Sequence, residues 1–239
     1  MAEPEAVVPT WTEVVSRGTN RLLLVPVGSF EQHGPHLPLD TDTRLATALV
    51  DEMADLACVV TAPPLPYGAS GEHAGFAGTL SIGSEVLADV LVELVRSARG
   101  SFAGVVLVST HGGNTEALGR VTERCEFEGD RVFVWRARVD GGDAHAGRTE
   151  TSLMLAIAPD AVRRGEIQPG RIDPLEHLWP DLRLNGVQAV SATGVLGDPT
   201  LATAAEGRRL FASWVEELRE SIESWWSDLS SPAVAGPIR

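Results

Sequence analysis

Two runs of apolar residues constrain the fold of this chain more than any other feature. Leu22–Val27 and Gly104–Ser109 lack the alternation of apolar and polar residues that a half-exposed strand shows. Such runs are typical of strands buried on both faces, as in parallel sheets covered by helices. We therefore expect both segments inside a parallel sheet.

Other segments alternate with these two strands. Cys58–Ala62 and Arg131–Arg136 predict two further strands. The spacing of apolar residues predicts helices over about 43–56, 84–98, 115–124, 149–157 and 203–227. This order predicts an α/β fold, a three-layer α/β/α sandwich with a mostly parallel central sheet. Residues 159–186 show no pattern that predicts an element.

Length and composition favour one domain over 1–239, with loose termini at about 1–10 and 230–239. No run of about 20 apolar residues predicts a membrane span. The acidic N-terminus does not resemble a secretory signal. Cys58 and Cys125 are too few for a disulfide framework, so we expect a cytoplasmic protein.

The charge balance argues against nucleic acid as a partner. The chain carries 33 acidic and 19 basic residues, for a net charge of −14. A surface this acidic repels phosphate backbones, and no cluster of basic and aromatic residues offsets it.

The segment 28–42 predicts a metal site. Glu31 and His33 are two residues apart and project to the same side of an extended chain, which Pro35 and Pro38 stiffen. Asp42 follows at the start of a predicted helix. Carboxylate and imidazole donors suit a divalent metal, which can lower the pKa of bound water from about 15.7 to about 7. This chemistry predicts a metal-dependent amide hydrolase.

A polar surface loop is the alternative interpretation, with Asp42 only capping its helix. The two prolines argue against it, because a stiff segment is useful where side chains must be oriented. Near a helix N-terminus Asp42 stays ionised, which suits a ligand that bridges two ions.

His111 follows the second apolar run and precedes two glycines that permit a tight turn. We interpret it as a further metal ligand. An anion-binding turn at a helix start and a structural histidine are the alternatives.

His145 and Glu150 precede and open a predicted helix. His145 suits proton transfer to a leaving amine, because the pKa of an ordinary imidazole is near 6.5. Glu150 is a candidate metal ligand, or the residue that orients His145, and a helix-capping glutamate is the alternative.

Three further histidines and three arginines are also candidates for roles near the site. His36 and His73 suit positions around the site or structural roles equally well, and His177 suits a loop. One of Arg136, Arg138 and Arg148 could pair with a substrate carboxylate. These three arginines flank the predicted site.

Four motifs together resemble the creatininase (creatinine amidohydrolase) family, in the order in which that family has them. They are residues 26–42, Gly78–Ser81, Thr110–Asn114 and His145–Ser152. The resemblance implies an α/β/α fold, two divalent metals per subunit and a homo-oligomer, often a hexamer. It also implies Glu31, His33, Asp42 and His111 as ligands, with Asp42 bridging, and His145 as the acid/base residue.

The chain departs from creatininase at two positions. Gly113 stands where creatininase has a glutamate ligand, so Glu150 is our candidate for the replacement ligand, or a single ion is bound. Gly141 stands where creatininase has a tryptophan against its ring substrate. Creatinine is therefore not the expected substrate, and a larger ligand is expected.

Residues flanking the first motif resemble the peptidases of the mycofactocin system of actinobacteria. This resemblance implies a small modified peptide substrate, cleaved to release its cross-linked C-terminal Val-Tyr dipeptide unit. The alternatives are a deformylase or cyclic amidase of the same family and a non-catalytic metal- or peptide-binding protein. The donor set accepts Zn, Fe or Mn.

Overall fold

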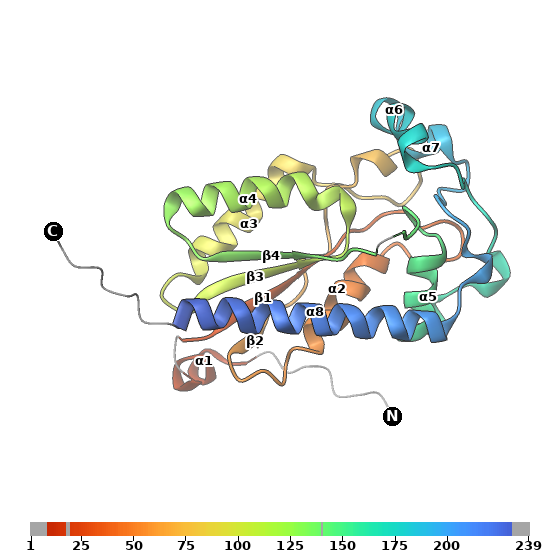
Figure 1. The fold of residues 1–239 in the computed structure, drawn as a ribbon. Helices are drawn as coiled ribbons and strands as arrows, with labels where there is room; N and C mark the ends of the chain where they lie inside the picture. The colour runs from red at the N-terminus through yellow and green to blue at the C-terminus, as the bar shows by residue number, and fades with distance from the viewer. Residues whose placement is uncertain (1–8, 18–19, 140, 231–239) are drawn as a thin grey trace.

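The computed structural model describes residues 9–17, 20–139 and 141–230. Its elements, with η marking short 3-10 helices, are α1 (Trp11–Arg17), β1 (Leu22–Val27), α2 (Thr41–Asp51), β2 (Val59–Thr61), η1 (Gly71–His73), α3 (Ser84–Ala98), β3 (Gly104–Ser109), η2 (Gly112–Asn114), α4 (Thr115–Glu128), β4 (Val132–Arg136), α5 (Arg148–Ile157), η3 (Pro159–Ala161), η4 (Arg164–Glu166), α6 (Leu175–Asn185), α7 (Val187–Val190), η5 (Pro199–Leu201) and α8 (Ala204–Ser230). Figure 1 shows their arrangement.

The four strands form one parallel sheet in the order β2-β1-β3-β4. β1 and β3 are its central strands and pair from Leu22 opposite Gly104 to Val27 opposite Ser109. The chain leaves β1 for β2 on one side and returns to β3 on the other side. Loops that follow β1 and β3 therefore diverge at the carboxyl edge, which is where such sheets hold their ligands.

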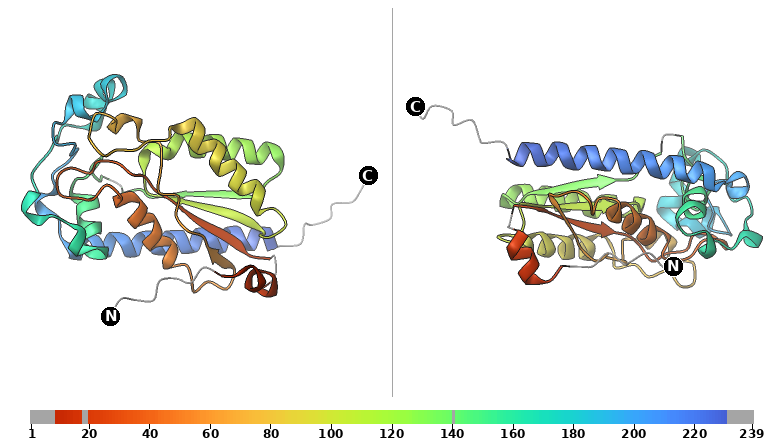
Figure 2. Two further views of the ribbon diagram at one scale, coloured as in Figure 1. Left: turned by 180° about the vertical axis from the view of Figure 1, so that it is seen from behind. Right: turned by 90° about the horizontal axis from the view of Figure 1, so that it is seen from below.

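Helices cover both faces of the sheet (Figure 2). On one face, α3 and α4 bury a core that includes Leu87, Leu91 and Leu118 against β1 and β3. On the other face, α2, α5 and α8 bury a second core, with Leu49 and Leu218 fully enclosed. The predicted three-layer α/β/α arrangement is confirmed, because both faces of the central strands are apolar and both are covered.

α8 packs against α5 at very close range. A Cβ atom added at Gly207 of α8 would lie 1.8 Å from the Ser152 carbonyl oxygen and 2.3 Å from its carbonyl carbon. Only glycine permits this approach of one helix to the backbone of the other. The contact matters for the site, because α5 also carries Glu150 in its first turn.

Several predicted boundaries were wrong by a few residues, and one region was not predicted at all. α2 begins at Thr41 and ends at Asp51, where turns replace the helix expected up to 56. Within 159–186 the structure has η3, η4 and α6, and the last of these contains an internal proline that weakens a helical pattern. α1 was also missed.

The expected loose termini fall mostly outside the described residues. Residues 9–10 precede α1 without regular structure, and Ser230 is the last residue of α8. In the described part of the chain, none of the helices combines the length and apolar character needed to cross a bilayer.

Candidate metal centre

All six predicted site residues meet at the carboxyl edge of the sheet. Glu31 and His33 follow β1 and His111 follows β3, while Asp42 lies in the first turn of α2. The remaining two are His145, just before α5, and Glu150, in its first turn. Five of the six are buried, and Glu150 keeps 20% of its side chain accessible.

Asp42 lies between two imidazoles. Its Oδ2 atom is 3.5 Å from His33 Nε2 and 3.3 Å from His111 Nδ1, and it accepts a 2.7 Å hydrogen bond from Ser29 Oγ. Burial alone would raise the pKa of this carboxyl, but His33 and His111 hold it well below its usual range. One oxygen of an ionised Asp42 thus faces both candidate ligand positions.

Glu31 is fully buried and faces three histidines. Its Oε2 is 3.1 Å from His111 Nε2, and its Oε1 is 3.5 Å from His73 Nε2 and 3.8 Å from His145 Nδ1. Burial raises the pKa of Glu31 to about 7, although the neighbouring His111 acts in the opposite direction. The carboxylate is therefore poorly stabilised by its neighbours alone.

Buried atoms without hydrogen-bond partners test whether a cation fits here. Among the described residues, both Glu31 carboxylate oxygens and His33 Nε2 are buried and have no such partner. A buried polar atom without a partner costs about 1–3 kcal/mol, and a charged one costs more. A divalent cation would satisfy all three atoms, so the residues present fit a metal.

The backbone orients two of the imidazoles for ligation. His33 Nδ1 is 3.1 Å from the Glu31 carbonyl oxygen, and His111 Nε2 is 3.0 Å from the Ala69 carbonyl oxygen. Because a carbonyl only accepts, those nitrogens carry the protons. The lone pairs of His33 Nε2 and His111 Nδ1 then face Asp42, which is the arrangement by which proteins fix metal-binding histidines.

Two groups of three donors lie around Asp42 and His33. Glu31, Asp42 and His111 form one group, and His33, His145 and Glu150 form the other, with the donor atoms of each group within 4.8 Å of one another. A third group, Glu31 with His73 and His145, overlaps both. The donor set therefore offers positions for two neighbouring ions.

The two candidate ligand histidines, His33 and His111, are strongly basic without a cation. Burial lowers their pKa values, but Asp42 and Glu31 outweigh it and raise the pKa of His33 to about 9 and that of His111 to about 10. Positive charge is thus favoured at these positions, and a metal ion would displace the protons.

His145 occupies a constrained position beside the cluster. Its Nε2–H donates to the backbone carbonyl oxygen of Gln32 over 2.7 Å. The lone pair of Nδ1 therefore points toward Glu31. Burial, with His33 and His73 nearby, lowers its pKa well below 6.5, so the ring is neutral. The next residue, Ala146, has a φ of 51°, and its N–H donates to Glu150 Oε2 over 2.6 Å.

The structure adds Gln32 and His73 to the site. The Gln32 amide nitrogen is 2.8 Å from His73 Nδ1 and donates to the Gly194 carbonyl oxygen at 3.1 Å, while its oxygen accepts from Gly34. The sequence analysis left a position around the site and a structural role equally open for His73. Gln32 lies between two predicted ligands, and that neighbourhood was the only signal for it.

Other predicted residues lie elsewhere. His36 Nε2 is 2.8 Å from Thr151 Oγ1, and His177 is exposed on α6. Arg148 pairs with Glu206 at 2.8 Å. None of Arg136, Arg138 and Arg148 is among the residues that line the cavity over the cluster.

Glu72 fills the space beside Gly113. A Cβ atom added at Gly113 would lie 2.4 Å from His111 Nε2 and 2.5 Å from Glu72 Oε1. The Glu72 carboxylate, which comes from η1, therefore lies against Gly113 and leaves no room for a side chain at that position.

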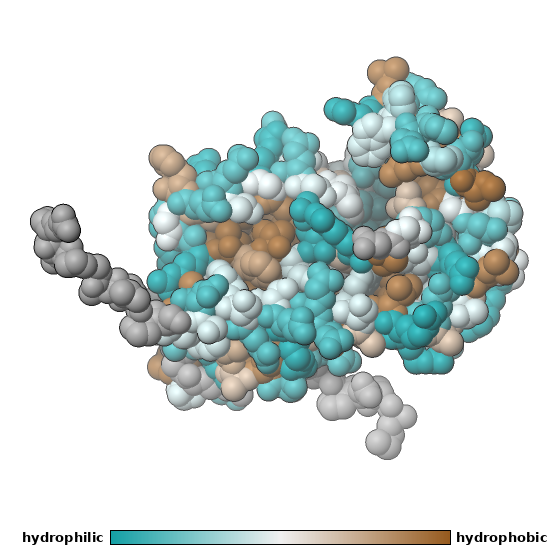
Figure 3. Space-filling view, viewed as in Figure 1, coloured by the Kyte–Doolittle hydropathy of each residue, from teal (hydrophilic) through white to brown (hydrophobic). Residues whose placement is uncertain are grey.

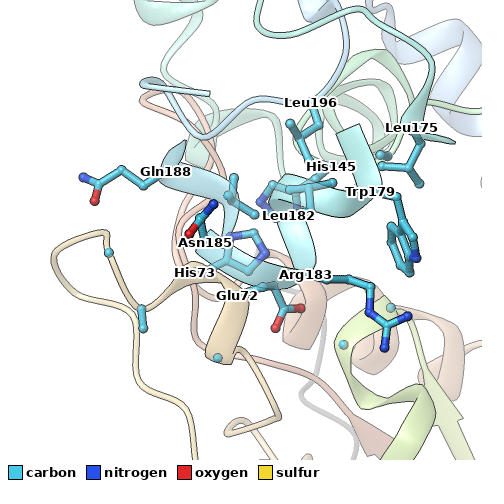
Figure 4. A pocket seen from close by; sticks show the side chains of 18 of the residues that line it. Glu72, His73, His145, Leu175, Trp179, Leu182, Arg183, Asn185, Gln188 and Leu196 are labelled. Atoms are coloured by element: carbon cyan, nitrogen blue, oxygen red, sulfur yellow. The ribbon is translucent and has the colours of Figure 1, made fainter. Parts of the chain in front are cut away.

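A cavity of about 900 Å³ opens over the cluster. One side holds Asp42, His111, His145 and Glu150, and the other is built by α6, α7 and Leu196. Figure 4 shows His73 and His145 beneath the side chains of α6, and Figure 3 shows the surface hollowed beside the lobe that carries α6 and α7. This volume lies near the upper end of the range of about 300–1,000 Å³ that is typical of small-molecule sites.

The sequence model of the creatininase family, described as creatinine amidohydrolase, matches residues 9–222. The chain belongs to the creatininase family. One family member, a mycofactocin precursor peptide peptidase of Mycolicibacterium smegmatis, is 50% identical over 214 residues, which cover 87% of this chain and 86% of that protein.

More distant members of the creatininase family are also similar. Creatinine amidohydrolase of Pseudomonas putida is 30% identical over 247 residues, covering 89% of this chain and 94% of that protein. A solved structure named Creatininase Mn superposes with a TM-score of 0.76 at 25% identity, over 91% of this chain and 96% of the other. These relatives are named as enzymes that hydrolyse C–N bonds, and this chain shares the creatininase fold. Its described residues also contain groups of candidate metal donors, in which three buried atoms have no hydrogen-bond partner.

Proposed function

We propose that this chain is a metal-dependent peptidase that hydrolyses the modified mycofactocin precursor peptide and releases its cross-linked C-terminal Val-Tyr dipeptide unit. The three buried donor atoms without partners, on Glu31 and His33, carry the proposal of metal-dependent hydrolysis. The relatives that are about half identical support the choice of substrate. The cavity of about 900 Å³ supports a ligand larger than creatinine.

For the ligands, we propose Glu31, Asp42 and His111 around one divalent ion and His33, Asp42 and Glu150 around a second, with Zn, Fe or Mn as the metal. Asp42 would contribute to both positions, since its Oδ2 faces both imidazoles. Divalent ions held there would supply Lewis acidity and lower the pKa of water from about 15.7 to about 7. Ser29 keeps Asp42 oriented through its 2.7 Å hydrogen bond.

His145 is the proposed proton carrier. Its Nε2–H is fixed by the Gln32 carbonyl oxygen, so Nδ1 is the atom that takes up a proton and passes it to the departing amine. Its lowered pKa suits this step, because a neutral imidazole accepts a proton and, once protonated, is a strong acid. The left-handed backbone of Ala146 and its bond to Glu150 hold the ring in place.

The test is incubation of the purified, metal-loaded protein with the modified precursor peptide, with mass spectrometry to detect the released unit. Asp42→Asn should lose metal and turnover together, as elemental analysis will show. His145→Ala should keep its metal and lose turnover, while His177→Ala, an exposed histidine outside the cluster, serves as the control. Turnover retained in His145→Ala would remove that residue from the mechanism.

We further propose that the chain acts in the cytoplasm as a homo-oligomer, with a hexamer as the state that the family resemblance implies. The free cysteines Cys58 and Cys125 support a reducing compartment. An apolar patch over the sheet-edge strand β4, between α4 and α8, supports self-association (Figure 3). Analytical ultracentrifugation measures the oligomeric state directly.

A further inference from the structure

One wall of the cavity carries four large apolar side chains beside the polar Arg183 and Asn185, whereas carboxylates lie on the opposite wall. Leu175, Trp179 and Leu182 of α6 line the cavity together with Leu196. Positions 175, 179 and 182 recur on one face of a helix, because residues three and four apart are neighbours there. Against this wall lie the carboxylates of Asp42, Glu72 and Glu150. A ligand that fills the cavity therefore meets charge at one end and apolar surface at the other.

Trp179 is the largest side chain of this wall and is not engaged within the chain. It is 51% exposed. Among the described residues, its indole ring contacts no other aromatic ring, and its N–H donates no hydrogen bond. An exposed aromatic face with a free donor, inside a cavity over a catalytic cluster, is suited to binding a ligand.

Packing of α6 does not depend on this tryptophan. Leu178 and Leu182 anchor the helix in a small core with Val187 and Leu196. These four side chains are each at most 8% exposed, so they hold α6 in position over the site. Figure 4 shows Trp179 and Arg183 extending from α6 on the side away from His73. Replacement of Trp179 by alanine therefore removes part of the cavity surface without removing a core contact of α6.

We propose that Trp179 is the specificity-determining residue of this site and stacks on an aromatic side chain of the peptide substrate. That side chain belongs to the part of the peptide that extends from the scissile amide away from the acidic cluster. This assignment rests on the proposed peptidase function. It also explains why Gly141 can stand where creatininase has a tryptophan against its ring substrate. In this chain the aromatic side chain comes from α6, which follows His145 in the sequence, and not from the loop before His145. Stacking favours an aromatic ring over an aliphatic chain, because the indole face is flat and electron-rich.

The test compares steady-state kinetics of Trp179→Ala, Trp179→Phe and Trp11→Ala on the modified precursor peptide. Trp11 is the matched control, since it is 77% exposed on α1 and does not line the cavity. We expect Trp179→Ala to raise KM and weaken inhibition by the released dipeptide unit about tenfold or more, with kcat within about threefold and metal content unchanged. Trp179→Phe should restore most of the affinity, and Trp11→Ala should behave as the parent.

Two outcomes would overturn the role assigned to Trp179 and leave the proposed peptidase function intact. One is an unchanged KM and unchanged product inhibition in Trp179→Ala. The other is a raised KM in Arg183→Gln alone, which would mean that α6 recognises a charge, since Arg183 also lines the cavity. Failure of the parent protein to cleave the peptide at all would instead refute the peptidase function itself.

Discussion

The contact between α5 and α8 predicts how packing remote from the chemistry controls the metal centre. In Gly207→Ala, the new Cβ would lie 1.8 Å from the Ser152 carbonyl oxygen, whereas non-bonded heavy atoms prefer about 3.5–4.0 Å. Both partners belong to helices, so no flexible side chain can move aside. The helices must therefore separate by more than about 1 Å.

Overpacking of this kind costs about 1–3 kcal/mol and occasionally more. We expect about 3 kcal/mol for Gly207→Ala, because the clash is with backbone and opens the core around Leu153 and Leu218. For a chain of this size that corresponds to a fall in Tm of about 6–12 °C. The same shift of α5 displaces Glu150 from His33, so metal content should fall as well.

Thermal unfolding followed by circular dichroism, with metal analysis on the same samples, provides the measurement. Gly119→Ala is the matched control, since Gly119 is exposed within α4 and a Cβ there meets no atom within 4 Å. It should be neutral or more stable by about 0.5–1 kcal/mol. A Tm of Gly207→Ala within about 2 °C of the parent value would refute this account of the helix contact.

Two further predictions concern the cluster itself. Ser29→Ala should weaken zinc binding about 10–100-fold in competition with a chromophoric chelator, while Ser191→Ala, which removes a buried hydroxyl bonded only within its loop, should leave zinc affinity unchanged. The pKa values of His33 and His111, about 9 and 10, lie above the 6.5 of an unfolded histidine, so their stabilisation is complete below pH 6.5 and lost as the pH rises through 9–10. Urea unfolding of the metal-free protein should therefore show a loss on the order of 6 kcal/mol between pH 7 and pH 10. Equal stability at the two pH values would contradict the charge assignment.

The strands of the sheet and the positions of the main candidate donors could be predicted from the sequence. Leu22–Val27 and Gly104–Ser109 could be located because a strand buried on both faces has a local signature, an apolar run. Once those strands were assigned as parallel, Glu31, His33 and His111 had to meet at their carboxyl edge. Local pattern and topology sufficed for both conclusions.

Which other groups join these donors depends on contacts between distant parts of the chain. The Gln32 amide reaches His73, which is 41 residues away, and the Gln32 carbonyl holds His145, which is 113 residues away. Trp179 comes over the cavity on a helix that no periodicity predicted. These arrangements depend on how loops fold back across the sheet edge, and contacts between residues so far apart leave no mark on the sequence near either partner.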